Sequence, residues 1–103
     1  MRNQLIELDY LIIYAIALNR SNKALISDIM DEVERLWKVH NITFPKSKLK
    51  TPSYHYFYAR LNKLIDKGYV ERQGKRTYRI NRDNYDVIIE YIKSHIKFTY
   101  GLE

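Results

Sequence analysis

The amino-acid sequence has 103 residues, of which 46% are hydrophobic, and its 18 Lys/Arg against 12 Asp/Glu give a formal net charge of +6. This length predicts one domain, residues 1–103, with a small core. The chain contains no cysteine, which excludes disulfides, thiolate catalysis and cysteine-based zinc sites.

The positive charge is concentrated in one third of the chain. Residues 45–79 hold ten Lys/Arg and two acids, a local charge of +8. Residues 1–44 hold five bases and six acids, and residues 80–103 hold three and four, so each flank has a charge of −1. Scattered lysines are usually a solvated surface, but this concentration favours a surface that binds a polyanion, with duplex DNA the preferred partner.

The first predicted helix covers residues 3–19, where apolar side chains recur every three or four positions. Further apolar residues at 10–18 extend its apolar surface to most sides, so we expect more than one neighbour to cover it. That run is nine residues long and follows acidic residues, unlike a signal peptide. A bilayer-spanning helix needs about 20 residues, so we expect a soluble, cytoplasmic protein without membrane contact.

The second predicted helix covers residues 27–40. Ser27 is a favourable N-cap, and acids in the first turns suit the positive end of the helix dipole. The short segment at residues 24–26 is either a strand or a lead into this helix.

The third predicted helix covers residues 52–67, since Pro52 is tolerated at the first helical position and Gly68 suits a C-terminal position with positive φ. Its apolar face is predicted to comprise Tyr54, Phe57, Tyr58, Leu61, Leu64 and Ile65. Its opposite face comprises His55, Tyr56, Ala59, Arg60, Lys63 and Lys67.

A hairpin and a fourth helix complete the chain. Residues 69–72 and 77–80 alternate as short strands around a turn that contains Gly74. We expect Val70, Tyr78 and Ile80 to face inward. Residues 85–97 show helical spacing of isoleucines. The fold class is therefore predicted to be α+β and mostly helical.

Residues 51–80 resemble the recognition helix and wing of a winged helix-turn-helix regulator, closest to the PadR-like and MarR-like families. The resemblance is carried by Leu61-x-x-Leu64, by Gly68-Tyr69-Val70 and by the basic, alternating Thr77-Tyr-Arg-Ile80. Small winged-helix proteins of archaea and their viruses look similar, in which case the cytoplasm would be that of a host cell. The loop before Thr51 is longer and more basic than a tight helix-turn-helix turn.

The resemblance implies a three-helix core, a two-stranded wing at about residues 69–80 and a C-terminal helix. It also implies a regulator of transcription, with one helix in the major groove of DNA and the hairpin on the adjacent minor groove or backbone.

Two sets of candidate DNA-binding residues follow. The first set would read bases, and Arg60 has the fork geometry for guanine N7 and O6. It comprises Ser53, His55, Tyr56, Arg60, Lys63 and Arg76. The second set would bind phosphates and position the protein. It comprises Lys46, Lys48, Lys50, Arg72, Lys75 and Arg79.

Catalysis, metals and cofactors are not expected. His40, His55 and His95 lie in three separate predicted helices, which does not suit a metal site, and no acid–base constellation is visible. Two alternatives to duplex binding remain. One is a protein-interaction module that docks an acidic partner, and the other is an RNA or single-strand binder that uses Tyr56 for stacking.

The apolar first and last helices have two interpretations. They either close the core of one chain or form a two-fold interface between two chains. We favour a homodimer through both helices, which would present two recognition helices to half-sites about one turn of DNA apart.

Overall fold

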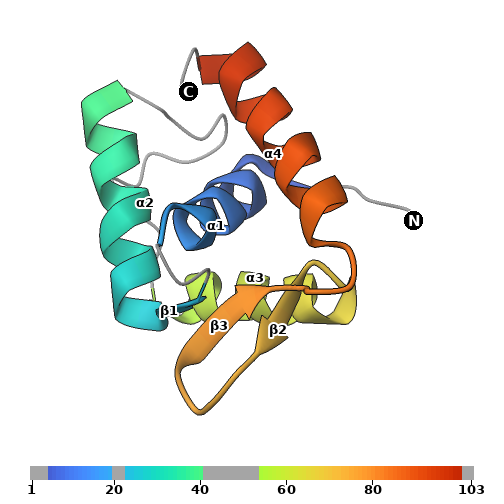
Figure 1. Ribbon diagram of the computed structural model, residues 1–103. Helices are drawn as coiled ribbons and strands as arrows, with labels where there is room; N and C mark the ends of the chain where they lie inside the picture. The colour runs from blue at the N-terminus through green and yellow to red at the C-terminus, as the bar shows by residue number, and fades with distance from the viewer. Residues whose placement is uncertain (1–4, 20–22, 41–53, 101–103) are drawn as a thin grey trace.

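The computed structural model describes residues 5–19, 23–40 and 54–100. In these residues the fold consists of four helices and a small sheet, which lies at one end of the molecule (Figure 1). In chain order the elements are α1 (Glu7–Leu18), β1 (Lys23–Leu25), α2 (Ile26–His40), α3 (Tyr54–Asp66), β2 (Val70–Arg72), β3 (Thr77–Ile80) and α4 (Tyr85–Tyr100). The prediction of a mostly helical α+β fold is confirmed. The first helix begins four residues later than predicted, and the last extends to Tyr100.

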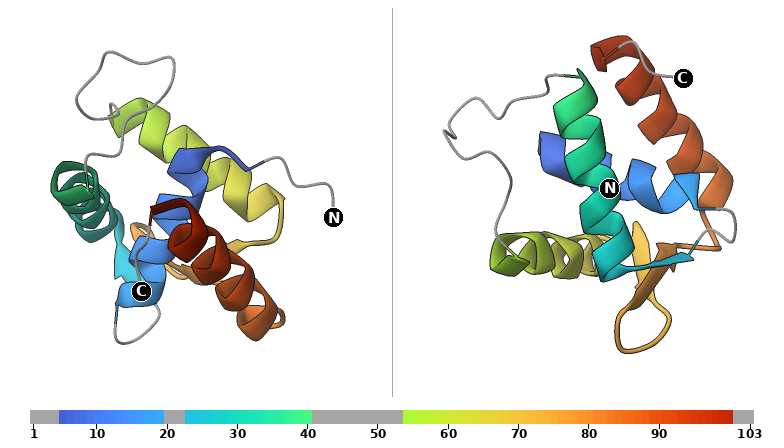
Figure 2. Two further views of the ribbon diagram at one scale, coloured as in Figure 1. Left: turned by 90° about the horizontal axis from the view of Figure 1, so that it is seen from above. Right: turned by 90° about the vertical axis from the view of Figure 1, so that its left-hand side faces the viewer.

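Helix α1 is the centre of the core. Every side chain from Leu8 to Ile16 is buried, because α1 packs against α2, α3, α4 and β3 (Figures 1 and 2). The prediction that this helix needs several neighbours is confirmed. The side chains from Leu8 to Ile16 are therefore covered within one chain, and we withdraw this part of the first helix from the predicted homodimer interface.

The sheet has three antiparallel strands in the order β1-β3-β2. The segment at residues 24–26 contributes a strand, since Ala24 pairs with Tyr78 on β3. Val70 pairs with Ile80 across the hairpin, and both side chains are buried as predicted.

Gly68 ends α3 and turns the chain into β2. Its φ of 84° lies in the left-handed region, which glycine adopts without steric cost. The Gly68 N–H donates to the Ile65 carbonyl, and the Tyr69 N–H donates to the Leu64 carbonyl, each at 3.0 Å. These two bonds form a Schellman motif, so α3 passes directly into the hairpin against which it packs.

The inner face of α3 is largely as predicted. Phe57, Leu61 and Leu64 are buried, and Tyr58 is half-buried. Tyr54 was predicted to face the core but is 50% exposed. It lies in the first turn and stacks on Tyr58, with ring centroids 6.1 Å apart, so its ring covers a neighbouring side chain instead of entering the core.

None of the helices in the described part of the chain combines the length and the apolar character needed to cross a membrane.

Candidate nucleic-acid interface

Helix α3 and the β2–β3 hairpin lie at the same end of the molecule. The hairpin loop projects from this end, while α4 runs away toward the opposite end (Figures 1 and 2). Most of the cations between residues 54 and 79 lie on these two elements. This surface, formed by α3 and the loop at residues 73–76, is called the basic end below.

The outward face of α3 presents polar side chains around a small one. His55, Ala59 and Asn62 are exposed at successive helical turns, and Lys63 lies beside them. The short Ala59 side chain leaves the helix backbone open to close approach. Asn62 was not among the predicted site residues, although its spacing of seven from His55 places both on one face.

The hairpin loop is held by Arg72. Its Nη2 donates to the Lys75 carbonyl at 2.8 Å and to the Tyr58 hydroxyl at 3.3 Å, while its Nε donates to the Gly74 carbonyl at 3.3 Å. The guanidinium also lies 5.9 Å from the centre of the Tyr78 ring. Arg72 therefore braces the loop and joins it to α3, which is a different role from the predicted phosphate contact.

Backbone hydrogen bonds close the loop and tie it to the start of α2. The Gln73 N–H donates to the Thr77 carbonyl at 2.8 Å, and the Ile26 N–H donates to the Arg76 carbonyl at 2.9 Å. The side chains of Lys75 and Arg76 remain exposed. The loop thus presents two cations from a backbone that is held at both ends.

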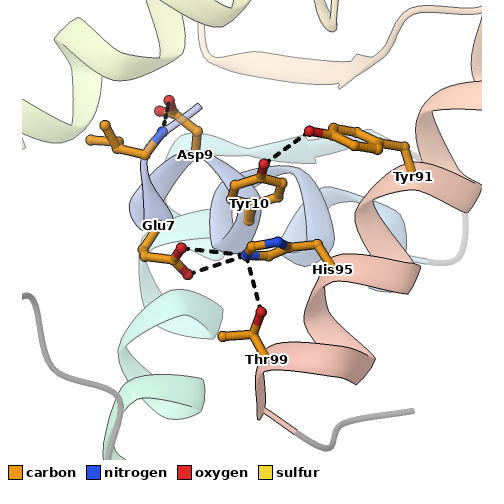
Figure 3. Close-up of polar contacts among 7 residues, drawn as sticks. Glu7, Asp9, Tyr10, Tyr91, His95 and Thr99 are labelled. Atoms are coloured by element: carbon orange, nitrogen blue, oxygen red, sulfur yellow. Dashed lines mark hydrogen bonds and ion pairs between the residues drawn. The ribbon is translucent and has the colours of Figure 1, made fainter. Parts of the chain in front are cut away.

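Arg60 lies in a buried ion pair with α1. Its Nε and Nη2 donate to the two carboxylate oxygens of Asp9 at 2.9 and 2.6 Å. Asp9 is completely buried, and the Arg60 side chain is only 15% exposed. The same carboxylate accepts a hydrogen bond from the Ile6 N–H at 3.0 Å and so caps the start of α1 (Figure 3).

This pair changes the interpretation of Arg60. The hydrogen bond to Asp9 raises the pKa of the guanidinium above its ordinary value. The two donors that a guanine would need already bind the carboxylate. We therefore assign Arg60 a structural role, which joins α3 to α1, and remove it from the base-reading set.

Arg79 is paired as well. Its Nε donates to Glu71 Oε1 at 2.8 Å across the hairpin, where the two residues are register partners. Arg82 Nε lies 3.7 Å from the same oxygen. One acid thus offsets part of the positive charge at the base of the hairpin.

The predicted site residues fall into three groups. Outside the described residues lie Lys46, Lys48, Lys50 and Ser53. Bound to other groups of the chain are Arg60, Arg72 and Arg79. Exposed at the basic end are His55, Tyr56, Lys63, Lys75 and Arg76.

A second polar cluster joins α1 to α4, away from the basic end (Figure 3). The Tyr10 and Tyr91 hydroxyls are hydrogen-bonded at 3.0 Å, and the Tyr10 ring stacks on His95 at 3.6 Å. His95 Nε2 lies 3.3 Å from Glu7 and 3.4 Å from the Thr99 hydroxyl. Burial and the contact with Tyr91 raise the pKa of Tyr10. This cluster orients α4 on the core.

Among the residues that the structure describes, no group of three or more His, Asp or Glu side chains is arranged to hold a metal ion. In comparisons with known proteins, no family model, curated protein or solved structure matches the chain.

Proposed function

We propose that this protein binds duplex DNA as a winged helix-turn-helix regulator of transcription. Helix α3 enters the major groove, and the loop at residues 73–76 contacts the adjacent backbone or minor groove. The observation that carries the proposal is the exposure of Lys63, Lys75 and Arg76 on two elements at one end of the molecule.

The dimensions and side chains of α3 support this use. Its 13 residues form a rod about 20 Å long, and a helix fits the major groove, which is about 12 Å wide. Ala59 allows the helix to approach the bases closely. Asn62 has the donor and acceptor that pair with adenine N6 and N7, and His55 is a second candidate for base contact. The exposed Asp66 would repel phosphates, which favours insertion of the N-terminal part of α3.

The bracing of the hairpin supports a role in binding. A loop that is already ordered loses less conformational entropy when it contacts a ligand. Arg72 and the hydrogen bond from Ile26 hold the loop in place. Lys75 and Arg76 can then contact phosphates, and an arginine is favoured where the minor groove is narrow.

The test uses preferred sites selected from a random duplex pool, with binding measured by fluorescence anisotropy. We expect the Lys75→Ala/Arg76→Ala double variant to weaken binding to all duplexes to a similar degree. We expect Asn62→Ala to cost about 1–3 kcal/mol on the preferred site and little on random DNA. Arg35→Ala is the control, because it removes one exposed cation from α2, where that cation is paired with Glu32.

Other results would favour other functions. If Arg35→Ala weakened binding as much per charge removed as the double variant does, only net charge would matter. No binding to any duplex at micromolar protein and low salt would favour a protein-interaction module with an acidic partner. Stronger competition by single strands than by duplex would favour stacking on Tyr56, whose ring is partly exposed.

A further inference from the structure

The outer side of α4 carries an apolar stripe. Phe98 is 92% exposed, Val87 is 68% exposed and Tyr91 is 45% exposed. With the exposed Ser94, these residues recur at intervals of four, three and four, so they form one line along the helix. Ile88, Ile92 and Ile96 anchor the opposite side of α4 in the core. The stripe therefore cannot rotate inward.

The flank of α4 beside this stripe carries acids in its first half and lysines in its second half. Asp86 and Glu90 lie in the N-terminal half of α4, and Lys93 and Lys97 lie in its C-terminal half. All four side chains are exposed. Their charges cancel overall, so the flank offers an anionic lipid surface no net attraction. It does offer complementarity to a helix that has the same pattern in the opposite direction.

We propose that α4 pairs in an antiparallel arrangement with α4 of a second copy of this chain. The two-fold axis passes beside residues 92 and 93, which are midway between Val87 and Phe98 and midway between Tyr91 and Ser94. Val87 then packs against the partner's Phe98, and Tyr91 packs over the partner's Ser94. The interface is isologous, so every contact occurs twice.

The charge pattern selects the antiparallel direction. In this arrangement Glu90 lies beside the partner's Lys93, and Asp86 lies beside the partner's Lys97. In a parallel two-fold pair the charged flanks of the two helices would lie on opposite sides of the interface, so these four charges would have no complementary partners across it. The antiparallel pair brings both flanks to the same side, where acids oppose lysines.

Tyr91 is suited to anchor the interface. Its hydroxyl is hydrogen-bonded to Tyr10 at 3.0 Å, which holds a half-exposed aromatic ring in one place (Figure 3). Preordered aromatic side chains lose little entropy on association and are frequent among the residues that dominate binding energy. The small Ser94 leaves room for the ring on the opposing helix.

The expected interface is small. Helix α4 has 16 residues and is about 24 Å long, whereas a standard interface buries about 800 Å² on each partner. We therefore expect a dissociation constant in the micromolar range. This inference is independent of DNA binding, and its first test contains no DNA.

The first experiment measures sedimentation equilibrium of the full chain from low to high micromolar concentration. We expect a concentration-dependent dimer. Phe98→Ser should weaken it at least tenfold, whereas Leu18→Ser, at another exposed apolar position, should leave it unchanged. Circular dichroism confirms that both variants are folded. A monomer at all concentrations, or an unaffected dimer in Phe98→Ser, would overturn the proposal.

The second experiment tests the charged flank. Glu90→Lys and Lys93→Glu should each weaken self-association, because each places like charges together twice. Mixing the two variants should restore dimers, because all opposing pairs are then of opposite sign. Failure of the mixture to associate better than either variant alone would contradict the proposed contact.

The third experiment tests whether the two α4 helices run antiparallel. The chain has no native cysteine, so only the introduced cysteines can be cross-linked. In the antiparallel pair the two Ser94 positions lie near the two-fold axis. The two Val87 positions are about 16 Å apart along the direction of the helices, because eleven residues separate them at about 1.5 Å each. A short bismaleimide should therefore join Ser94→Cys chains efficiently and Val87→Cys chains poorly. Equal cross-linking of the two variants would overturn the antiparallel arrangement.

Discussion

The ion pair between Asp9 and Arg60 shows how a side chain that resembles a base reader can serve the core. A completely buried carboxylate is stable only when its charge is paired and hydrogen-bonded. Arg60 supplies two donors, and the Ile6 N–H supplies a third. The pair fixes the start of α1 against the middle of α3, and so helps to set the angle at which α3 is presented.

We predict that Arg60→Ala will lower the free energy of unfolding by about 3–5 kcal/mol, because it leaves the Asp9 charge buried without its partner. Urea denaturation measures the loss. An Asp9→Leu/Arg60→Leu double variant should recover much of it, since an apolar pair leaves no unpaired charge. If Arg60→Ala kept full stability and lost only specific DNA binding, the base-reading role would be restored.

Buried tyrosines make stability depend on alkaline pH. Burial raises the pKa of Tyr69 above its ordinary value of 10.0, and it does the same for Tyr14 and Tyr78. Above pH 10 the unfolded chain therefore loses these protons before the folded chain does. The folded state then binds more protons than the unfolded state. The free energy of unfolding therefore has its full value below pH 10 and falls as the pH rises further.

We predict that Tyr69→Phe will reduce this alkaline loss. Among the described residues, the buried Tyr69 hydroxyl has no hydrogen-bond partner, so its removal should leave stability at pH 7 unchanged or higher. Urea denaturation at pH 7 and near pH 10.5 measures both effects. An alkaline slope equal to that of the natural chain would show that Tyr69 is not a source of the pH dependence.

At the scale of elements, the junction between α3 and the hairpin determines the basic end. The Schellman motif at Gly68 ends α3 and starts β2 with only a short turn between them. Arg72 then braces the loop against α3 through the Tyr58 hydroxyl. The helix and the loop are therefore held as one unit.

We predict that Gly68→Ala will destabilise the protein by about 1–2 kcal/mol, since a side chain at φ 84° is strained even though an added Cβ meets no atom within 4 Å. Gly74→Ala is the matched control. An added Cβ there is also unobstructed and the φ is not positive, so stability should change little. Thermal unfolding compares the two. Equal losses would show that the left-handed conformation at Gly68 is not the cause.

At the scale of the whole molecule, the cations are concentrated on α3 and the hairpin, but several of them are already bound within the chain. The ion pairs of Arg60 and Arg79 and the hydrogen bonds of Arg72 reduce the number of cations available for phosphate. Seven of the ten cations in residues 45–79 are then left. Lys67 is half-buried just after α3, so six remain candidates for phosphate contacts. They are Lys46, Lys48, Lys50, Lys63, Lys75 and Arg76.

We predict that the logarithm of DNA affinity falls with the logarithm of salt concentration with a slope of about −5. Each of the six candidate phosphate contacts contributes about −0.9 to this slope. Lys75→Ala and Arg76→Ala should each reduce the magnitude of the slope by about 1. Titrations at several salt concentrations measure it. A slope near zero for the natural chain would contradict phosphate binding altogether.

The sequence alone determined most of the local structure. Helical spacing located all four helices, the Gly68 position identified the end of α3, and alternation identified the strands with Val70, Tyr78 and Ile80 inward. These features depend on interactions between residues only a few positions apart, so the spacing of residue types along the sequence is enough to predict them. The outward position of Asn62 was available from the same spacing and was overlooked.

Only the tertiary structure decided which charges are free and which apolar surfaces are covered. Asp9 and Arg60 are 51 positions apart, and Glu7 and His95 are 88 apart, so no local pattern pairs them. Helix α1 and helix α4 both looked rich in apolar surface, yet α1 is enclosed and α4 exposes a stripe. Such differences arise because burial and ion pairing depend on where the chain path brings distant segments together.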